Sequence, residues 1–379
     1  MVSSAFSKLN IRRIVSHVHR HGASARAALI EELGVTPATI TRLTNELLDL
    51  GILEEIPDPA KKGKKGFPSK LLKIKPHSIL TVGIYFDPDV LRTCLADLEG
   101  NILAEQRFPI ENRAFNVIME KASRSVDVLI EQSGCNPDRI IGGGITYPGQ
   151  YIDTKQGTAK IRQFSDWPTA ELKGSFSDYF DFPMYHINDA KAACLAELYY
   201  GSCKSYQNYC YVWLSYGIGG AAVINQSLYT GHSHVAAEFG GLFPKSQPRP
   251  SGQDLLDTLK DNGVHVERLD EIEDTHLTLP CVQDWLSRSH VQLEWLCLVI
   301  ARTFAPQAIV VGGTLAPQLL KDIYRNLAAK REFGEDFVID PPDIIQAATD
   351  DNPHLGAAVL PIDALINPAR YSGRVFKNS

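Results

Sequence analysis

The first 75 residues place their apolar side chains at helical spacing in three short segments, and this pattern most limits what the chain can fold into. A helix ending near Gly22 is predicted because four apolar residues fall on one of its faces: Ile11, Ile14, Val15 and Val18. A second, shorter helix is predicted to begin at Ser24 or Ala25. It ends at Gly34, since glycine accepts the left-handed conformation of a helix C-terminus.

The third helix carries two start signals. Thr36 suits the N-cap, and Pro37 suits the first helical position, where its missing N–H costs nothing. Its apolar face is made of Ile40, Leu43, Leu47 and Leu50. The free face then presents hydroxyl, guanidinium and amide groups from Thr39, Thr41, Arg42 and Asn45. Such groups read base edges in the major groove, so this helix, with Thr36 at its start, is predicted to be a recognition helix.

A lysine-rich hairpin follows the third helix. Residues 52–56 and 70–74 are predicted strands, and the segment between them holds Lys61, Lys62, Lys64 and Lys65. Residues 1–75 carry 13 Lys and Arg against 7 Asp and Glu, a net charge of +6, whereas residues 76–379 carry 25 against 37, a net charge of −12. Alone, a lysine run is more often a solvated loop. Joined to three helices, it predicts a winged helix-turn-helix over residues 1–75 that binds double-stranded operator DNA.

Composition limits the rest of the chain. Its 379 residues are 44% hydrophobic and 22% charged, which is ordinary for a globular protein of more than one domain. No stretch approaches the roughly 20 apolar residues of a membrane span, and the N-terminus lacks the apolar core of a signal peptide. The seven cysteines are scattered without paired metal spacing. We therefore expect reduced thiols, a cytoplasmic location and no membrane partner.

Strand and helix patterns recur in a repeated order after residue 76. The first set is predicted at residues 79–84, 91–97, 102–108, 114–132, 140–146 and 190–200. The second set is predicted at residues 209–214, 221–224, 227–231, 291–304, 308–311, 317–330 and 355–365. Three strands, then helix, strand and helix, given twice, predict an α/β body of two lobes with a cleft between them. The predicted lobes are residues 76–200 and 201–379.

Short motifs in this body occur in an order that resembles the ROK family, in which sugar-responsive bacterial repressors are joined to sugar kinases. They are Gly83-Ile84, Tyr147-Pro148-Gly149, Asn188-Asp189-Ala190, Glu238-Phe239-Gly240 and Val310-Val311-Gly312-Gly313. The resemblance covers nearly the full chain. It implies a two-lobed ribonuclease-H/actin-like, sugar kinase-like body behind the winged helix, a small-molecule sugar effector, and a homodimer or homotetramer.

The resemblance also implies a sugar site. Asp189 matches the aspartate that takes a proton from a sugar hydroxyl in the family's kinases, and Asn188 beside it can donate and accept hydrogen bonds. Glu238 matches a glutamate that accepts bonds from sugar hydroxyls, and Gln163 stands where the family usually has an asparagine. His234 is a further predicted sugar contact. The alternative is that Asn188 and Asp189 only cap the helix that follows them.

Departures from the family matter as much as the matches. Tyr85 stands where the kinases have the aspartate of the first phosphate loop, Pro88 follows it, and Tyr216 replaces a small hydroxyl residue in the second loop. Bulky residues keep backbone N–H groups away from phosphate oxygens, so no catalytic residue and no cofactor are predicted. Gly241 replaces the histidine of the family's zinc site, so no metal is predicted.

The wing departs from the family as well. Phe67 replaces an arginine that would enter the minor groove, so it is predicted to pack against DNA sugars or to wedge at a base step. Phosphate contacts are then predicted for Lys62, Lys64 and Lys65. The chain is interpreted as a sugar-responsive transcriptional repressor with a non-catalytic body. Two alternatives stay open, namely an ATP-dependent sugar kinase that keeps a DNA-binding domain, and a regulator without a ligand that a protein partner controls.

Overall fold

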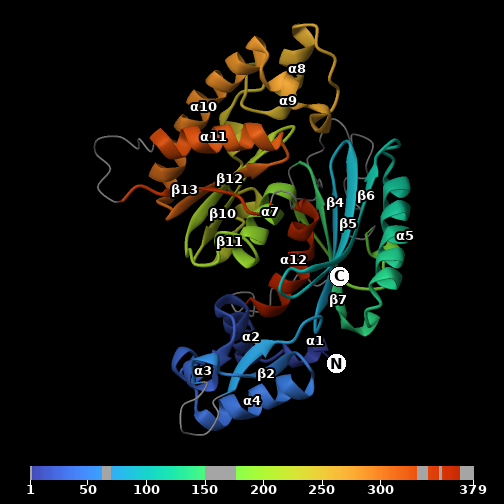
Figure 1. Cartoon of the computed structure of the whole chain (residues 1–379), viewed down its shortest axis with the longest axis vertical. Coiled ribbons are helices and arrows are strands. Elements are labelled where there is room, and N and C mark those ends of the chain that lie inside the picture. Colours follow the sequence, from blue (N-terminus) through green and yellow to red (C-terminus); the bar gives the residue numbers. More distant parts are fainter. Residues whose placement is uncertain (1, 62–69, 150–175, 331–339, 350–351, 368–379) are drawn as a thin grey trace. The chain divides into compact units, whose positions relative to one another are not determined.

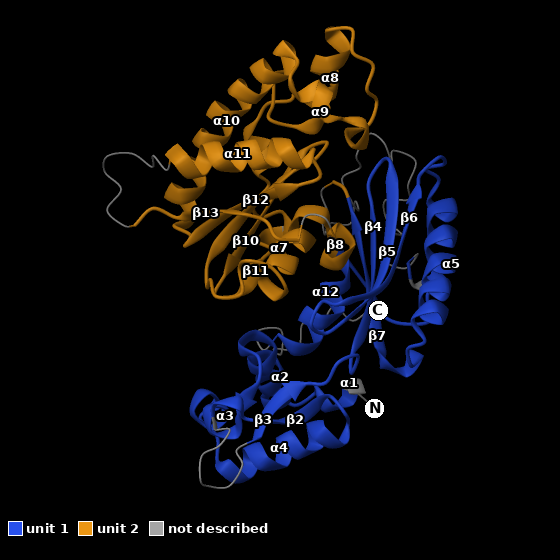
Figure 2. Cartoon of the chain, viewed as in Figure 1, with its two compact units in different colours: residues 1–147, 162–187, 357–379 blue, residues 148–161, 188–356 orange. Residues whose placement is uncertain are grey.

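The computed structural model describes residues 2–61, 70–149, 176–330, 340–349 and 352–367 (Figure 1). Contacts divide the chain into two compact units (Figure 2). Unit 1 contains residues 1–147, 162–187 and 357–379, and unit 2 contains residues 148–161 and 188–356. Each unit is made of separate stretches of the chain, and neither begins or ends at residue 75 or 200. The domain boundaries predicted there therefore stay predictions. No described helix is both long and apolar enough to cross a membrane.

Unit 1 begins with helices packed on a small antiparallel sheet. The helices are α1 (Val2–Ala5), α2 (Leu9–His21), α3 (Arg26–Leu33) and α4 (Pro37–Asp49). The sheet has the order β1-β3-β2, from β1 (Ser24–Ala25), β3 (Lys70–Ile74) and β2 (Leu53–Pro57), and η1 (Pro59–Lys61) follows β2. The predicted helices and both hairpin strands are confirmed. Ser24 and Ala25 were expected to start a helix, but they form a strand because they pair with Leu72 and Leu71.

Local signals account for where α4 begins and which face it buries. The Thr36 hydroxyl accepts a hydrogen bond from the backbone N–H of Thr39 at 3.3 Å, which satisfies a donor that the helix itself cannot use. Ile40, Leu43 and Leu47 are buried at 0–2% exposure and form the apolar stripe that faces α2 and α3. Capping and periodicity therefore act together here.

The rest of unit 1 is built on a five-stranded sheet of order β6-β5-β4-β7-β8. Its strands are β4 (Leu80–Phe86), β5 (Val90–Asp97), β6 (Ile102–Pro109), β7 (Ile140–Tyr147) and β8 (Met184–Asn188). β4 pairs antiparallel with β5 and parallel with β7. Helix α5 (Phe115–Ser133) packs on β5 and β6, and the short helices η2 (Pro137–Arg139) and η4 (Ser177–Tyr179) flank β7 and β8.

Helix α12 (Pro353–Ile366) lies against β7 because a glycine stands at the crossing point. A Cβ atom on Gly144 would fall 1.9 Å from the carbonyl oxygen of Ala357, so any other residue would push the helix away. The same helix is tied to the N-terminal helices by Arg12, which is 8% exposed. The Arg12 side chain donates to the carbonyls of Phe6 at 2.7 Å and Ala364 at 2.9 Å.

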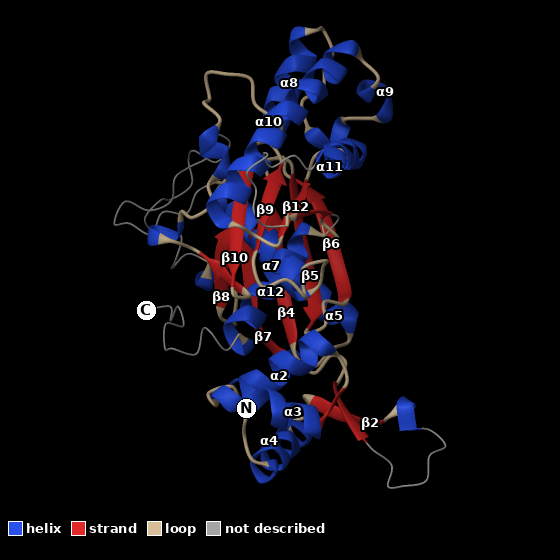
Figure 3. Ribbon diagram, turned by 90° about the vertical axis from the view of Figure 1, so that its left-hand side faces the viewer, coloured by secondary structure: helices blue, strands red, loops and turns tan. Residues whose placement is uncertain are grey.

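Unit 2 repeats the strand order of unit 1 in a second five-stranded sheet, β11-β10-β9-β12-β13. Its strands are β9 (Tyr209–Leu214), β10 (Ile218–Ile224), β11 (Ser227–Tyr229), β12 (Ala308–Gly313) and β13 (Asp343–Gln346). Figure 3 labels β9, β10 and β12 of this sheet. As in unit 1, the first three strands in the chain pair antiparallel, and the next one joins parallel. This repetition is the physical basis of the predicted duplication.

Helices cover the second sheet and form the core of unit 2. They are α7 (Asp189–Tyr199), α8 (Gly252–Asp261), α9 (Asp274–Leu277), α10 (Pro280–Phe304) and α11 (Pro317–Lys330). Trp285 and Leu296 of α10 are both fully buried and anchor this core. The sequence predicted only residues 291–304 of α10 and did not predict α8, β8 or β13. The short strands have too few residues to reveal a period.

Candidate functional site

The free face of α4 presents two side chains that are available for contact. Arg42 and Asn45 are exposed, and neither side chain forms a hydrogen bond with a described residue. The threonines of the same face are partly occupied. The Thr41 hydroxyl donates to the carbonyl of Pro37 at 2.9 Å, and Thr36 caps the helix through Thr39. Arg42 and Asn45 are therefore the side chains best able to reach another molecule.

The lysine-rich segment cannot be placed beside α4. Lys62, Lys64, Lys65 and Phe67 lie outside the described residues, so their predicted contacts stay predictions. The strands on either side are described and are held together by charge. Glu55 on β2 pairs with Arg26 of α3 at 2.8 Å and with Lys70 of β3 at 2.5 Å.

The predicted sugar site centres on the start of α7, where Asn188 acts as the N-cap. Its side-chain oxygen accepts from the backbone N–H groups of Ala190 at 3.0 Å and Lys191 at 3.4 Å. Its side-chain nitrogen donates to the carbonyl of Gly149 at 2.6 Å. The capping role that the sequence left open for Asn188 is therefore the one seen here, and its amide positions the chain more than it faces solvent.

Two carboxylates and one ammonium group carry the chemistry next to this cap. Asp189 is the first residue of α7, is partly buried, and accepts the Ala190 N–H at 2.8 Å. Lys191 is only 2% exposed and donates to Glu238 at 2.8 Å. Together these groups offer both acceptors and a charged donor, which is what the hydroxyls of a polyol need.

Lys191 was not singled out in the sequence, although it directly follows the Asn188-Asp189-Ala190 motif. The signal that could have found it is its place in α7, where every residue from Ala190 to Tyr199 is buried. A lysine in such a helix needs an anionic partner, because burying an unpaired charge is costly. The quoted motifs contain two acidic residues, Asp189 and Glu238, and the structure pairs Lys191 with Glu238.

Two glycines of β10 bring the start of α7 and the Glu238 segment close to the sheet. A Cβ atom on Gly219 would fall 2.7 Å from the Cβ of Ala190. A Cβ atom on Gly220 would fall 2.4 Å from the carbonyl oxygen of Ala237. Glycine at both positions thus permits the Lys191–Glu238 contact.

Two further sugar contacts were predicted from the sequence, at Gln163 and His234. Gln163 lies outside the described residues. His234 ends the short helix η5 (His232–His234), four residues before Glu238, and has a φ of +60°. A left-handed conformation is uncommon for a histidine and marks this segment as one whose backbone is fixed by its surroundings. Both assignments stay predictions.

The first loop that departs from the kinase pattern is closed by its own carboxylate. The Asp87 side chain accepts the backbone N–H groups of Asp89 and Val90, each at 2.8 Å, and the Tyr85 hydroxyl at 3.2 Å. Asp87 is 9% exposed, and this burial raises the pKa of its carboxyl to about 6. The N–H groups that could have bound a phosphate are thus already occupied, and by a group that would repel one.

The second loop is also tied down. Ser215 and Thr314 share a hydroxyl hydrogen bond at 2.6 Å, and Tyr216 accepts the Leu269 N–H at 3.3 Å. Gly313, which has a φ of +145°, lies so close to β9 that a Cβ atom would fall 1.8 Å from the carbonyl oxygen of Leu214. A side chain at position 313 would therefore push β12 away from β9.

The segment expected to hold zinc in related proteins is held here by other contacts. The Arg249 side chain donates to the carbonyl of Gly240 at 2.8 Å, and the Arg249 backbone N–H donates to the Asp254 carboxylate at 3.1 Å. Arg288 of α10 pairs with Asp254, and Phe243 packs edge-on against Trp295 at 5.8 Å. In the parts of the chain that the structure describes, no three His, Cys, Asp or Glu side chains gather as metal ligands would.

Comparison with known proteins assigns the body to a family. The model of the ROK family matches residues 81–364. The chain is 30% identical to the uncharacterized protein y4fQ of Sinorhizobium fredii, over 85% of this chain and 82% of that protein. It is 26% identical to the xylose repressor of Bacillus subtilis, over 95% of this chain and 96% of the repressor.

The fold is shared with a solved structure over nearly the whole length. A crystal structure of a ROK family transcriptional regulator, a homologue of the E. coli MLC protein, superposes with a TM-score of 0.74. It covers 96% of this chain and 98% of its own, at 18% sequence identity. At that identity the likeness establishes the fold, with its mixed sheets and covering helices, and the resemblance stated from the sequence motifs is confirmed.

The buried Asp87 predicts a pH dependence of stability. Because its folded pKa of about 6 lies above the ordinary value of 3.8, the unfolded chain releases this proton first. Stability is therefore lost as pH rises from about 4 to about 6, by up to about 3 kcal/mol at 1.36 kcal/mol per pKa unit. Asp87→Asn should remove this loss. The free energy of unfolding of the variant should therefore rise relative to that of the wild type as the pH rises across that range.

Urea unfolding at pH 4.5 and 7.5, followed by tryptophan fluorescence, measures the effect. The control is Asp284→Asn on the exposed face of α10. A stability difference between Asp87→Asn and wild type that is the same at both pH values would contradict the assignment.

Proposed function

The chain belongs to the ROK family, and we propose that it is a sugar-responsive transcriptional repressor. The observation that carries this proposal is an N-terminal domain of helices and a hairpin joined to a ROK body. Helix α4 of that domain presents Arg42 and Asn45 to solvent. Similarity to the xylose repressor of Bacillus subtilis over 95% of this chain supports it, since that span reaches into the N-terminal domain.

In this proposal the N-terminal domain is a winged helix-turn-helix and α4 is its recognition helix. Arginine can bond two acceptors on a guanine edge, and asparagine can bond an adenine edge in the same way. The net charge of +6 on residues 1–75 supplies the attraction to phosphates, and the net charge of −12 on the remainder limits nonspecific wrapping. We further propose a homodimer or homotetramer on a pseudo-palindromic operator, the arrangement that two-fold helix-turn-helix proteins use.

We propose that the effector is a sugar or sugar derivative bound at the start of α7. Asp189 and Glu238 would accept bonds from its hydroxyls, and Lys191 would donate one. Binding must favour one of two arrangements of the repressor, because a ligand with equal affinity for both changes nothing. A coupling of roughly 1–3 kcal/mol is enough for ordinary induction.

A second function, an ATP-dependent sugar kinase, is less well supported. The family contains kinases, and Asp189 occupies the position of their general base. In the first loop the Asp87 carboxylate already accepts the backbone N–H groups of Asp89 and Val90, and in the second loop the Ser215 N–H donates to the Gly217 carbonyl, which disfavours ATP binding. A regulator that binds no ligand and is controlled by a protein partner is a third possibility, which the screen described below separates.

Arg42→Ala is expected to weaken specific operator binding by roughly tenfold to a hundredfold, the value of about 1–3 kcal/mol for a bidentate base contact. Binding to random duplex should change much less. Fluorescence anisotropy at fixed salt measures both, on an operator selected from a random library. Arg325→Ala, which removes an exposed arginine from α11, is the matched control. Equal losses on both DNAs would make Arg42 a phosphate contact and remove it from base reading.

Asp189→Asn is expected to abolish the response to the sugar while operator affinity is kept, because the amide can still accept the Ala190 N–H but is a weaker acceptor for hydroxyls. A thermal-shift screen against hexoses, pentoses, amino sugars, polyols and their phosphates first identifies the sugar. Titration of the operator complex then measures release, with Asp284→Asn as the control. Unchanged release would exclude Asp189 from the site, and a screen without any stabilising sugar would favour the partner-controlled regulator.

The purified protein is expected to show no magnesium-dependent ATP turnover with any sugar that the screen finds. A coupled assay for ADP, with a ROK glucokinase as the positive control, tests this directly. Turnover that is lost in Asp189→Asn would reverse the assignment in favour of the kinase.

A further inference from the structure

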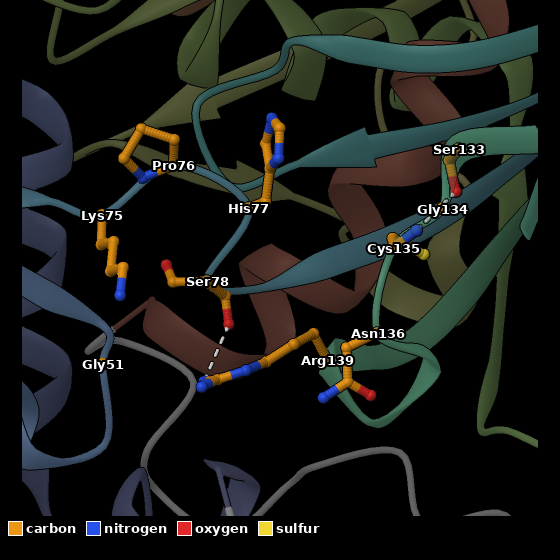
Figure 4. A pocket seen from close by; sticks show the side chains of 10 residues that line it. All are labelled: Gly51, Lys75, Pro76, His77, Ser78, Ser133, Gly134, Cys135, Asn136 and Arg139. Carbon is orange, nitrogen blue, oxygen red and sulfur yellow. Dashed lines mark hydrogen bonds between the residues drawn. The ribbon is translucent and has the colours of Figure 1, made fainter.

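A cavity of about 330 Å³ lies in unit 1 where the N-terminal domain joins the body (Figure 4). Gly51 and Lys75 reach it from the N-terminal domain, and Ser133 to Asn136 and Arg139 reach it from the body. Its size is at the lower end of the range for small-molecule sites, about 300–1,000 Å³. None of the functions proposed above uses it.

One wall of the cavity is the turn that connects β3 to β4. The backbone N–H of Ser78 donates to the carbonyl of Lys75 at 3.2 Å, with Pro76 and His77 at the centre of the turn. His77 has a φ of +56°, a left-handed conformation that is uncommon for residues other than glycine. The joint between domain and body is thus a fixed turn with an open space beside it.

Arg139 ties the two sides of this joint together. One of its terminal nitrogens donates to the carbonyl of Leu50 at 3.0 Å, just after α4, and more weakly to that of Ser78 at 3.4 Å. Figure 4 shows the guanidinium between Gly51 and Ser78. These bonds use one nitrogen, so the other N–H groups of the fork remain for a further acceptor.

The charges around the cavity all have one sign. Its ten lining residues include Lys75, His77 and Arg139 and contain no aspartate or glutamate. Among the residues that the structure describes, no carboxylate is given as an ion-pair partner of these three. The Ser78 hydroxyl, in a residue 4% exposed, has no hydrogen-bond partner there. The two cations Lys75 and Arg139, with an unsatisfied hydroxyl beside a small space, suit the binding of an oxyanion.

We propose that this cavity binds a small phosphate monoester, held by Lys75 and the free edge of Arg139. Arginine suits this role because its planar fork matches two phosphate oxygens. The bound anion would contact the N-terminal domain and the body at once, so it would be a second effector site separate from the start of α7. A backbone phosphate of DNA has the same chemistry. The free ester is favoured because most of the lining belongs to the turn and the body and little of it to the domain that carries α4.

Asn136→Asp tests the site without disturbing the fold. Asn136 accepts the Asp138 N–H at 3.0 Å, and an aspartate oxygen can accept it as well. The change places a negative charge on the lining. Asn112→Asp is the matched control, since Asn112 accepts the Ala114 N–H at 2.9 Å in the same way and does not line the cavity. Lys75→Gln, with Lys73→Gln as its control, removes one cation.

The measurement is calorimetric titration of the full-length protein with inorganic phosphate, against chloride at equal ionic strength, in the absence of sugar and DNA. Wild type, Asn112→Asp and Lys73→Gln should bind phosphate saturably with one affinity. Lys75→Gln should weaken binding about tenfold because it removes one charge-assisted bond, and Asn136→Asp should weaken it more because it adds a charge that repels the anion. Equal affinity in all variants, or no saturable binding in the wild type, overturns the proposal.

A second arm separates the two sources of phosphate. If the cavity holds a DNA backbone phosphate, Lys75→Gln and Asn136→Asp should weaken random-duplex binding and reduce its salt slope by about one. That result without saturable phosphate binding would overturn the free-ester proposal. Because this test uses neither operator nor sugar, its failure would leave the proposed repressor function untouched.

Discussion

Close approach of a helix backbone to a sheet is the constraint on which the rest of this structure depends. Gly144 on β7 leaves room for the carbonyl of Ala357, and α12 can therefore lie on the sheet of unit 1. Arg12 then finds the carbonyl of Ala364 on that helix, so the N-terminal helices are fixed to the body through it. In unit 2, Gly219 likewise leaves room for α7 to approach the sheet at Ala190. A methyl group at either glycine would displace the helix that packs against it.

The start of α7 is fixed by contacts on two sides. Capping by Asn188 fixes the first turn, and the buried pair of Lys191 and Glu238 fixes the neighbouring segment. The two loops that correspond to the phosphate loops of the family's kinases differ from them in their residues, whereas the strands that carry these loops are present. Asp87 takes the backbone donors of the first loop, and its burial raises the pKa of the carboxyl, so an added phosphate would meet a competing acceptor.

Much of this organisation could be predicted from sequence where a local signal was strong. Thr36 and Pro37 marked the start of α4, and residues 70–74, which follow a loop rich in glycine, proline and lysine, were predicted as the strand β3. The ROK motifs led to the family, which the match over residues 81–364 established. The edge strands β8 and β13 were missed, because four or five residues give no readable period and their pairing depends on neighbours far away in the chain.

By itself, therefore, the sequence determined the strands of the repeated sheets other than β8 and β13, the charge contrast between residues 1–75 and the remainder, and the residues that depart from the kinase phosphate loops. Those properties depend on neighbouring residues and need no long-range contact. Only the tertiary structure decided that Lys191 pairs with Glu238 and that Arg12 donates to the carbonyl of Ala364. It also decided that Arg139 donates to the carbonyl of Leu50, beside a cavity whose lining has no aspartate or glutamate. Each of these pairs is separated by tens to hundreds of residues, so its partner becomes visible only when packing brings the two segments together.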